Sequence, residues 1–133
     1  MYILDTNVIS AVRRPDRAPQ VAAWLRGKAE QDLYLSVITL GEIERGIRQQ
    51  ETRDPGFAND LRTWLDRTVL LFSDRLLPFE AEDARIWGRL SAEIGHSGAD
   101  LMIAASALHR GATVVTGNVN DFAPTKVAVE NPF

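Results

Sequence analysis

The sequence predicts an α/β protein of three layers, α/β/α, with a small and mostly parallel central sheet. Short apolar runs typical of buried strands alternate with longer segments whose apolar residues recur at helical spacing. Their order is a strand, two helices, a strand, four helices and a strand. This order is typical of a parallel sheet that helices cover on both faces.

The first third of the chain is expected to form two strands and two helices. An apolar run over 2–4 leads directly into Asp5-Thr6-Asn7, where the first helix begins. Arg13-Arg14-Pro15-Asp16 interrupts that helix, and Asp16 can cap the next one. The run 33–35 is the second predicted strand.

The middle of the chain predicts two helices and an edge strand. One helical pattern begins at Thr39 and places Glu42 in its first turn. The polar stretch 49–56 connects it to an amphipathic helix over 57–69. The run 76–79 is predicted as an edge strand, because its proline cannot donate to an interior ladder.

The last third predicts a helix over 80–94, which Gly95 is well placed to end. A second helix of small apolar residues follows over 98–110. The remaining predictions are a strand over 112–115, a loop over 116–122 and a short strand over 127–129. No repeat or linker divides the chain, so one domain over 1–133 is expected, and that length suffices for one core.

Composition excludes several classes of site. The chain has no cysteine, so disulfides, thiolate metal sites and cysteine nucleophiles are excluded, and a metal must bind through oxygen or histidine. The start of the sequence lacks the pattern of a secretory signal, and no apolar run reaches membrane-spanning length. We therefore expect a cytoplasmic protein that makes no membrane contact. A net charge of -3 argues against nucleic-acid binding, but bound cations would offset it.

Four acidic residues stand where predicted strands pass into helices or loops: Asp5, Glu42, Asp100 and Asp121. Because such junctions gather at one edge of an open α/β sheet, we expect these carboxylates to share a pocket. Neutral hydrogen-bonding groups are predicted at the same edge: Thr6, Asn7, Thr116 and Asn118. Groups of this kind orient carboxylates and water around a metal ion.

Each acid also has a purely structural explanation. Asp5 and Asp100 stand where carboxylates cap helices. The segment 39–42 fits the capping-box pattern, and Asp121 lies in a loop typical of Asx-turns. A structural domain whose acids are only caps is therefore a competing interpretation.

If the four carboxylates do meet, divalent cations are needed to offset their repulsion. Oxygen ligands favour Mg²⁺ or Mn²⁺, and Mg²⁺ commonly binds substrate phosphate oxygens as well. Two such ions about 4 Å apart activate a water and stabilise the leaving oxygen of a phosphodiester. An aspartyl-phosphate phosphatase is disfavoured, because its second aspartate would stand where this chain has Asn7.

Taken together, these segments resemble the PIN-domain ribonucleases of the VapC type, the toxins of bacterial toxin-antitoxin pairs, and within them the FitB-like branch. The matching segments are Ile3-Leu4-Asp5-Thr6-Asn7, the run 36–46 with Glu42, Asp100-Leu101-Met102-Ile103-Ala104-Ala105, the run 115–122 and Asn131-Pro132-Phe133. The resemblance covers the whole chain. It implies a PIN-like fold.

The resemblance further implies that Asp5, Glu42, Asp100 and Asp121 are the catalytic, metal-binding acids, supported by Thr6, Asn7, Thr116 and Asn118. It implies Mg²⁺ or Mn²⁺, an RNA substrate, a homodimer and a cognate antitoxin, with operator DNA bound only through the antitoxin. Many relatives carry arginine where this chain has Gly117. That departure and the net acidity favour an alternative, a catalytically weak protein that acts with its antitoxin as a DNA-bound autorepressor.

Overall fold

The computed structural model describes residues 1–133 and contains one five-stranded sheet in which every neighbouring pair is parallel. The strand order is β3-β2-β1-β4-β5. The strands are β1 (Tyr2–Leu4), β2 (Leu33–Ser36), β3 (Leu76–Leu77), β4 (Thr113–Val115) and β5 (Val129–Glu130). Ile3 of the central strand pairs with Tyr34 on one side and Val114 on the other. The prediction of a small parallel sheet is confirmed.

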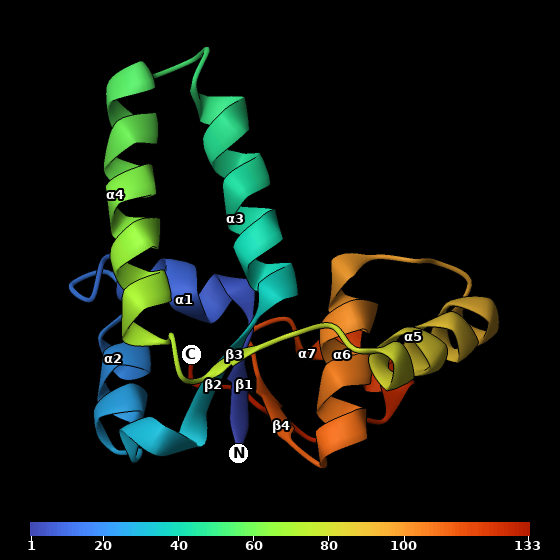
Figure 1. The fold of residues 1–133 in the computed structure, drawn as a ribbon. Coiled ribbons are helices and arrows are strands. Elements are labelled where there is room, and N and C mark those ends of the chain that lie inside the picture. The colour runs from blue at the N-terminus through green and yellow to red at the C-terminus, as the bar shows by residue number, and fades with distance from the viewer.

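Helices cover both faces of this sheet. They are α1 (Thr6–Val12), α2 (Pro19–Arg26), α3 (Val37–Gln50), α4 (Pro55–Leu71), α5 (Ala81–Ile94), α6 (Ala99–Arg110) and α7 (Val119–Phe122), with 3-10 turns at Glu30–Asp32 and Ala123–Thr125. Figure 1 shows α1 to α4 on one side of the strands and α5 to α7 on the other, with α3 and α4 projecting as a hairpin. The three-layer α/β/α prediction is confirmed. None of the helices is both long and apolar enough to cross a bilayer.

Alternating side chains of the central strands build two separate cores. Ile3 and Val114 pack with α6, which presents the small side chains of Ala104 and Ala107. Their neighbours in sequence, including Leu4, point to the opposite face and pack with α1 and α2. Successive strand residues point to opposite faces of a sheet, so burial of both sets requires helices on both sides.

Three sequence predictions need correction. The third helix begins at Val37 rather than Thr39, because Ser36 caps it by accepting a hydrogen bond from the Ile38 N–H at 3.0 Å. The predicted loop over 116–122 contains the short helix α7, and the last strand lies at Val129–Glu130 rather than 127–129. Gly95 does end α5, with a φ of 95° that suits glycine.

A buried carboxylate joins α5 to α6. Asp83 is fully buried and accepts hydrogen bonds from the Ser106 hydroxyl at 3.0 Å and the Arg110 guanidinium at 3.0 Å. The His109 ring lies 2.6 Å from it, and the Glu80 N–H donates to it at 3.0 Å. Burial disfavours the charged form, but these hydrogen bonds outweigh it and hold the pKa of Asp83 below its ordinary value. His109 thus has a structural partner at the contact between α5 and α6.

Candidate functional site

The site lies beyond the carboxyl ends of β1 and β4. The chain leaves β1 toward β2 on one side, whereas β4 pairs with β1 on the other side. This is a topological switch point, where open α/β sheets leave a crevice for ligands. Asp5 directly follows β1 and Thr116 directly follows β4.

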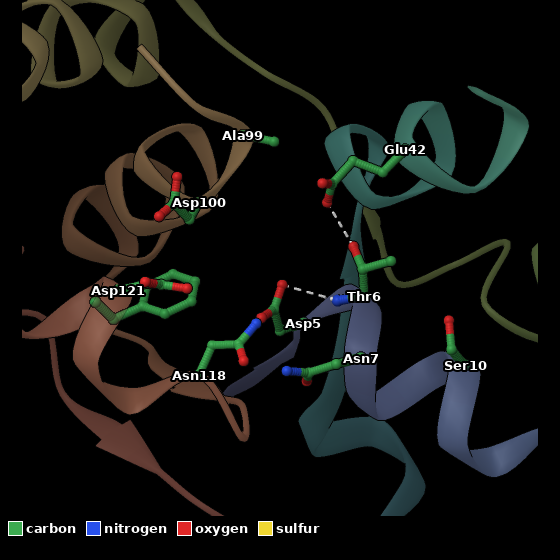
Figure 2. A pocket seen from close by; sticks show the side chains of 10 residues that line it. Asp5, Thr6, Asn7, Ser10, Glu42, Ala99, Asp100, Asn118 and Asp121 are labelled. Atoms are coloured by element: carbon green, nitrogen blue, oxygen red, sulfur yellow. Dashed lines mark hydrogen bonds between the residues drawn. The ribbon is translucent and has the colours of Figure 1, made fainter. Parts of the chain in front are cut away.

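A cavity of about 510 Å³ opens at this crevice. It is lined by Asp5, Thr6, Asn7, Ser10, Glu42, Ala99, Asp100, Asn118, Asp121 and Phe122. Figure 2 shows Asp5 near the middle, with Asp100, Asn118 and Asp121 on one side and Thr6 and Glu42 on the other. The structure therefore brings all four predicted acids to one cavity, from four separate parts of the chain.

Asp5 is both a helix cap and a member of this acidic cavity. One carboxylate oxygen accepts from the Thr6 N–H at 2.8 Å, at the start of α1. The other accepts from the Thr116 hydroxyl at 2.7 Å. The residue is only 6% exposed. Asp5 is thus a helix cap, but capping accounts for the contact of only one of its two carboxylate oxygens.

The surroundings of Asp5 disfavour its negative charge. Burial raises the pKa of the Asp5 carboxyl above its ordinary value, against the hydrogen bonds from Thr116 and Thr6, which lower it. The negative charges of Glu42 and Asp100 raise that pKa further. A divalent cation at this position would offset the cost of ionising Asp5, because its positive charge favours the charged form of the carboxylate.

Glu42 does not form the capping box that the sequence suggested. It lies in the second turn of α3, and its carboxylate accepts from the Thr6 hydroxyl at 2.6 Å. The same hydroxyl lies 3.4 Å from that of Thr39. Thr6 therefore ties the start of α1 to α3 and holds the Glu42 carboxylate at the wall of the cavity.

Asp100 and Asp121 form the opposite wall. Asp100 lies in the first turn of α6 and accepts from the Leu101 N–H at 3.1 Å. A Cβ at Gly98 would come within 2.7 Å of the same Asp100 oxygen, so glycine leaves room for the carboxylate. Asp121 is exposed on α7, at the mouth of the cavity.

Two of the supporting residues, Asn7 and Asn118, converge on Thr116, which is fully buried. Its hydroxyl donates to Asp5 and accepts from the Asn118 N–H at 2.9 Å. The Asn7 amide lies 3.4 Å from the same hydroxyl. The adjacent Gly117 has no space for a side chain, because a Cβ there would come within 2.8 Å of the Phe133 ring. An arginine at position 117 would therefore require that ring to move.

The donor set fits a hydrated divalent ion rather than a closed cage. No three aspartate, glutamate or histidine side chains are arranged as ligands of one ion. Mg²⁺ usually takes one or two carboxylates and keeps several waters, so it does not require three. Oxygen donors only, crowded carboxylates and a cavity with room for water match that chemistry.

Sequence reasoning missed two polar residues of the site, Ser10 in the cavity wall and Thr39 beside Thr6. Ser10 follows Thr6 by four positions on α1, so helical spacing alone predicts that both lie on one face. Thr39 was assigned to a helix cap, which hid its position inside α3.

Comparison with known proteins shows which family and which relatives the chain is similar to. The PIN domain family matches residues 2–126. Toxin FitB of Neisseria gonorrhoeae is 36% identical over 139 residues, covering 100% of this chain and 99% of that protein. Ribonuclease VapC14 of Mycobacterium tuberculosis is 41% identical over 97 residues, covering 72% of this chain and 90% of that protein. A solved structure of FitAB bound to an IR36 DNA fragment is 36% identical with a TM-score of 0.83, covering 99% of this chain and 95% of that one.

Proposed function

We propose that this chain, which belongs to the PIN-domain family, is a metal-dependent endoribonuclease and the toxin of a toxin-antitoxin pair. One observation carries the proposal: Asp5, Glu42, Asp100 and Asp121 line a single cavity at the switch point of the sheet. The names of two relatives, Toxin FitB and Ribonuclease VapC14, support the toxin and the ribonuclease parts of it.

Asp5 and Asp100 would be the central pair that holds hydrated Mg²⁺ or Mn²⁺, and Glu42 and Asp121 would act on the ion through its waters. When bound, the ion supplies charge neutralisation for the phosphate and lowers the pKa of water for attack. The Thr116 hydroxyl orients the Asp5 carboxylate, and the Thr6 hydroxyl orients that of Glu42. Asn118 contributes a neutral amide on the same side of the cavity as Asp121.

The test compares RNA cleavage by the wild type and by Asp5→Asn, in Mg²⁺ and in Mn²⁺. Asp60→Asn is a matched control, because Asp60 is exposed on α4, outside the cavity. We expect the wild type to cleave RNA and a chelator to stop the cleavage. The cleavage rate should fall at least about 100-fold in Asp5→Asn and should not change in Asp60→Asn. Equal rates in the wild type and Asp5→Asn would refute the enzymatic proposal.

The proposed partners are a cognate antitoxin and a second copy of the chain. A solved structure of VapBC-5 of Mycobacterium tuberculosis, described as a member of the VapBC family of toxin-antitoxin systems and 28% identical to this chain, supports an antitoxin partner. Co-expression with a short reading frame that adjoins its gene should yield a complex of defined stoichiometry, and sedimentation of the toxin alone should report a dimer. A monomer at micromolar concentration would contradict the homodimer.

A second candidate function is autorepression as part of a DNA-bound complex. The solved FitAB structure on a DNA fragment favours it, as does the net charge of -3, which leaves DNA contact to the partner. Under this alternative, the complex shifts promoter DNA in a salt-dependent manner, and the toxin alone cleaves no RNA. Retained RNA cleavage would reduce autorepression to an accompanying role.

A further inference from the structure

A second hollow, of about 310 Å³, opens beside the acidic cavity between α1 and the α3–α4 hairpin. We call it the hairpin hollow and define it by Arg13 after α1, Gln50 of α3 and Phe57, Leu61 and Trp64 of α4. Both hollows share Thr6, Ser10 and Glu42 in their walls. In Figure 2, Ser10 and Glu42 lie on the α1–α3 side of the cavity, away from Asp100. The two hollows are therefore neighbours on the α1–α3 side of the site.

The walls of the hairpin hollow combine flat apolar surfaces with one cation. The Arg13 guanidinium lies over the Phe57 ring, 5.1 Å from its centroid. Arg13 takes part in none of the ion pairs of the protein, so its charge is not neutralised by a carboxylate. Trp64 and Leu61 are partly buried and form the apolar part of the wall.

We infer that the hairpin hollow binds a nucleobase of single-stranded RNA, in the nucleotide next to the phosphodiester held in the acidic cavity. The inference rests on the proposed ribonuclease function. Unpaired bases of RNA stack on aromatic side chains and on arginine guanidinium planes, which is the pair that Arg13 and Phe57 present. Since the hollows share a wall, a base in one and its phosphate in the other belong to adjacent positions of one strand.

Charge favours RNA over a protein segment as the occupant. The acidic cavity repels phosphate unless cations are present, and Arg13 supplies a fixed positive charge at the exit toward α4. A nucleotide presents a flat apolar base beside a negative phosphate, which matches an apolar wall beside a guanidinium. An apolar side chain of a protein partner would make no use of that charge.

The variants that test the inference are conservative changes on the walls of the hairpin hollow. Phe57→Leu retains an apolar side chain but removes the ring, and Arg13→Lys retains the charge but removes the planar group. Leu70→Ala is the control on the same helix, because Leu70 is 74% exposed and lies outside both hollows. Stacking on one base corresponds to about tenfold or more in affinity. We therefore expect KM for RNA to rise about tenfold in Phe57→Leu, less in Arg13→Lys and not in Leu70→Ala, with kcat within about twofold.

A substrate change identifies the base. Once cleavage is mapped on a mixed-sequence RNA, the nucleotide on either side of the cut is replaced by an abasic ribose. On the side whose base enters the hairpin hollow, the abasic substitution should raise KM for the wild type. It should not raise KM further for Phe57→Leu, because the two changes remove the same contact. Fully additive losses on both sides would refute the base-binding site.

Binding separates this inference from the proposed function. Fluorescein-labelled RNA is titrated into each variant in Ca²⁺, with anisotropy as the readout. Absence of cleavage by the wild type would refute the ribonuclease, whereas equal RNA affinity of the wild type and Phe57→Leu would refute the base site. If Phe57→Leu weakens only binding of the antitoxin and leaves RNA affinity unchanged, the hairpin hollow is a protein-docking site and the inference is wrong.

Discussion

The hydroxyl of Thr116 should contribute substantially to the free energy of unfolding. Thr116→Val keeps the shape of the side chain but removes the 2.7 Å hydrogen bond to Asp5 and the acceptor for the Asn118 N–H. A hydrogen bond to a charged group contributes about 1.5–3 kcal/mol, so we expect a loss of about 2–3 kcal/mol in the free energy of unfolding. For a chain of 133 residues this corresponds to roughly 6–12 °C in Tm.

Urea unfolding near neutral pH measures this loss, and Thr116→Ser, which keeps the hydroxyl, is the control. The hydrogen bond favours the charged form of Asp5, whose pKa is raised by burial from its ordinary value of 3.8. The loss of the Thr116 hydroxyl raises the pKa of Asp5 further in the variant. The difference between Thr116→Val and the wild type should therefore be complete above both raised pKa values and shrink as the pH falls through them, because below them Asp5 is protonated in both folded proteins. A difference below about 0.5 kcal/mol at neutral pH would refute the role given to Thr116, because that is the usual size of a neutral surface change.

Three further predictions concern acidic side chains. Because the folded-state pKa of Asp5 is raised, its ionised form destabilises the folded state at pH values above 3.8, and Asp5→Asn should match or exceed the thermal stability of the metal-free wild type. The variant should, however, lose the stabilisation of about 1.4 kcal/mol that Mn²⁺ at ten times its Kd gives the wild type. If calorimetry shows that the variant is still stabilised by Mn²⁺, Asp5 is not a ligand. Asp83→Ala should cost about 3–5 kcal/mol at neutral pH. Because the pKa of Asp83 is lowered, its contribution is present above 3.8 and is lost as the pH falls through the lowered value, so urea midpoints of this variant and the wild type should converge in acid. The pKa of Glu51 is lowered by the guanidinium groups of Arg62 and Arg48. Because its side chain is 31% exposed and both ion pairs lie at the surface, Glu51→Ala should leave the midpoint of urea unfolding nearly unchanged.

The sheet edge was predictable because strand ends are visible in the sequence. The run Tyr2–Leu4 ends in polar residues, and so does the run that leads to Thr116, which places both at the carboxyl ends of neighbouring strands. The turn of the helix that carries Glu42 was mispredicted for a local reason, although its place in the cavity was predicted correctly. Ser36 and Thr39 are both good N-caps, and only the packed structure decides that Ser36 caps α3.

Other features depend on tertiary contacts that a sequence does not display. The helix α7 has four residues, too few for a helical period to be recognised. Asp83, in the first turn of α5, has the pattern of a capping acid, and its burial follows from the side chains of α6 that close over it. The hairpin hollow combines Arg13 with Phe57, residues that only the packing of α1 against α4 brings together.

Hydrogen-bond capacity distinguishes the functional acid from the structural one. Asp83 and Asp5 are both buried, and a carboxylate offers about four lone-pair positions. Those of Asp83 are all used, by the Glu80 N–H, Ser106, His109 and Arg110. Within the chain, Asp5 receives donors only from Thr6 and Thr116, so about two positions are available to water or an ion in the cavity.

Burial with unused acceptor capacity is costly unless another partner supplies the missing interactions. Around Asp5 the neighbouring groups make that cost larger, because Glu42 and Asp100 bring further negative charge and no basic side chain lines the cavity. A helix cap alone explains the Thr6 contact but not this crowding. A hydrated divalent cation accounts for both the free acceptor positions and the concentration of negative charge, which is why the metal belongs to the proposed function rather than to the fold.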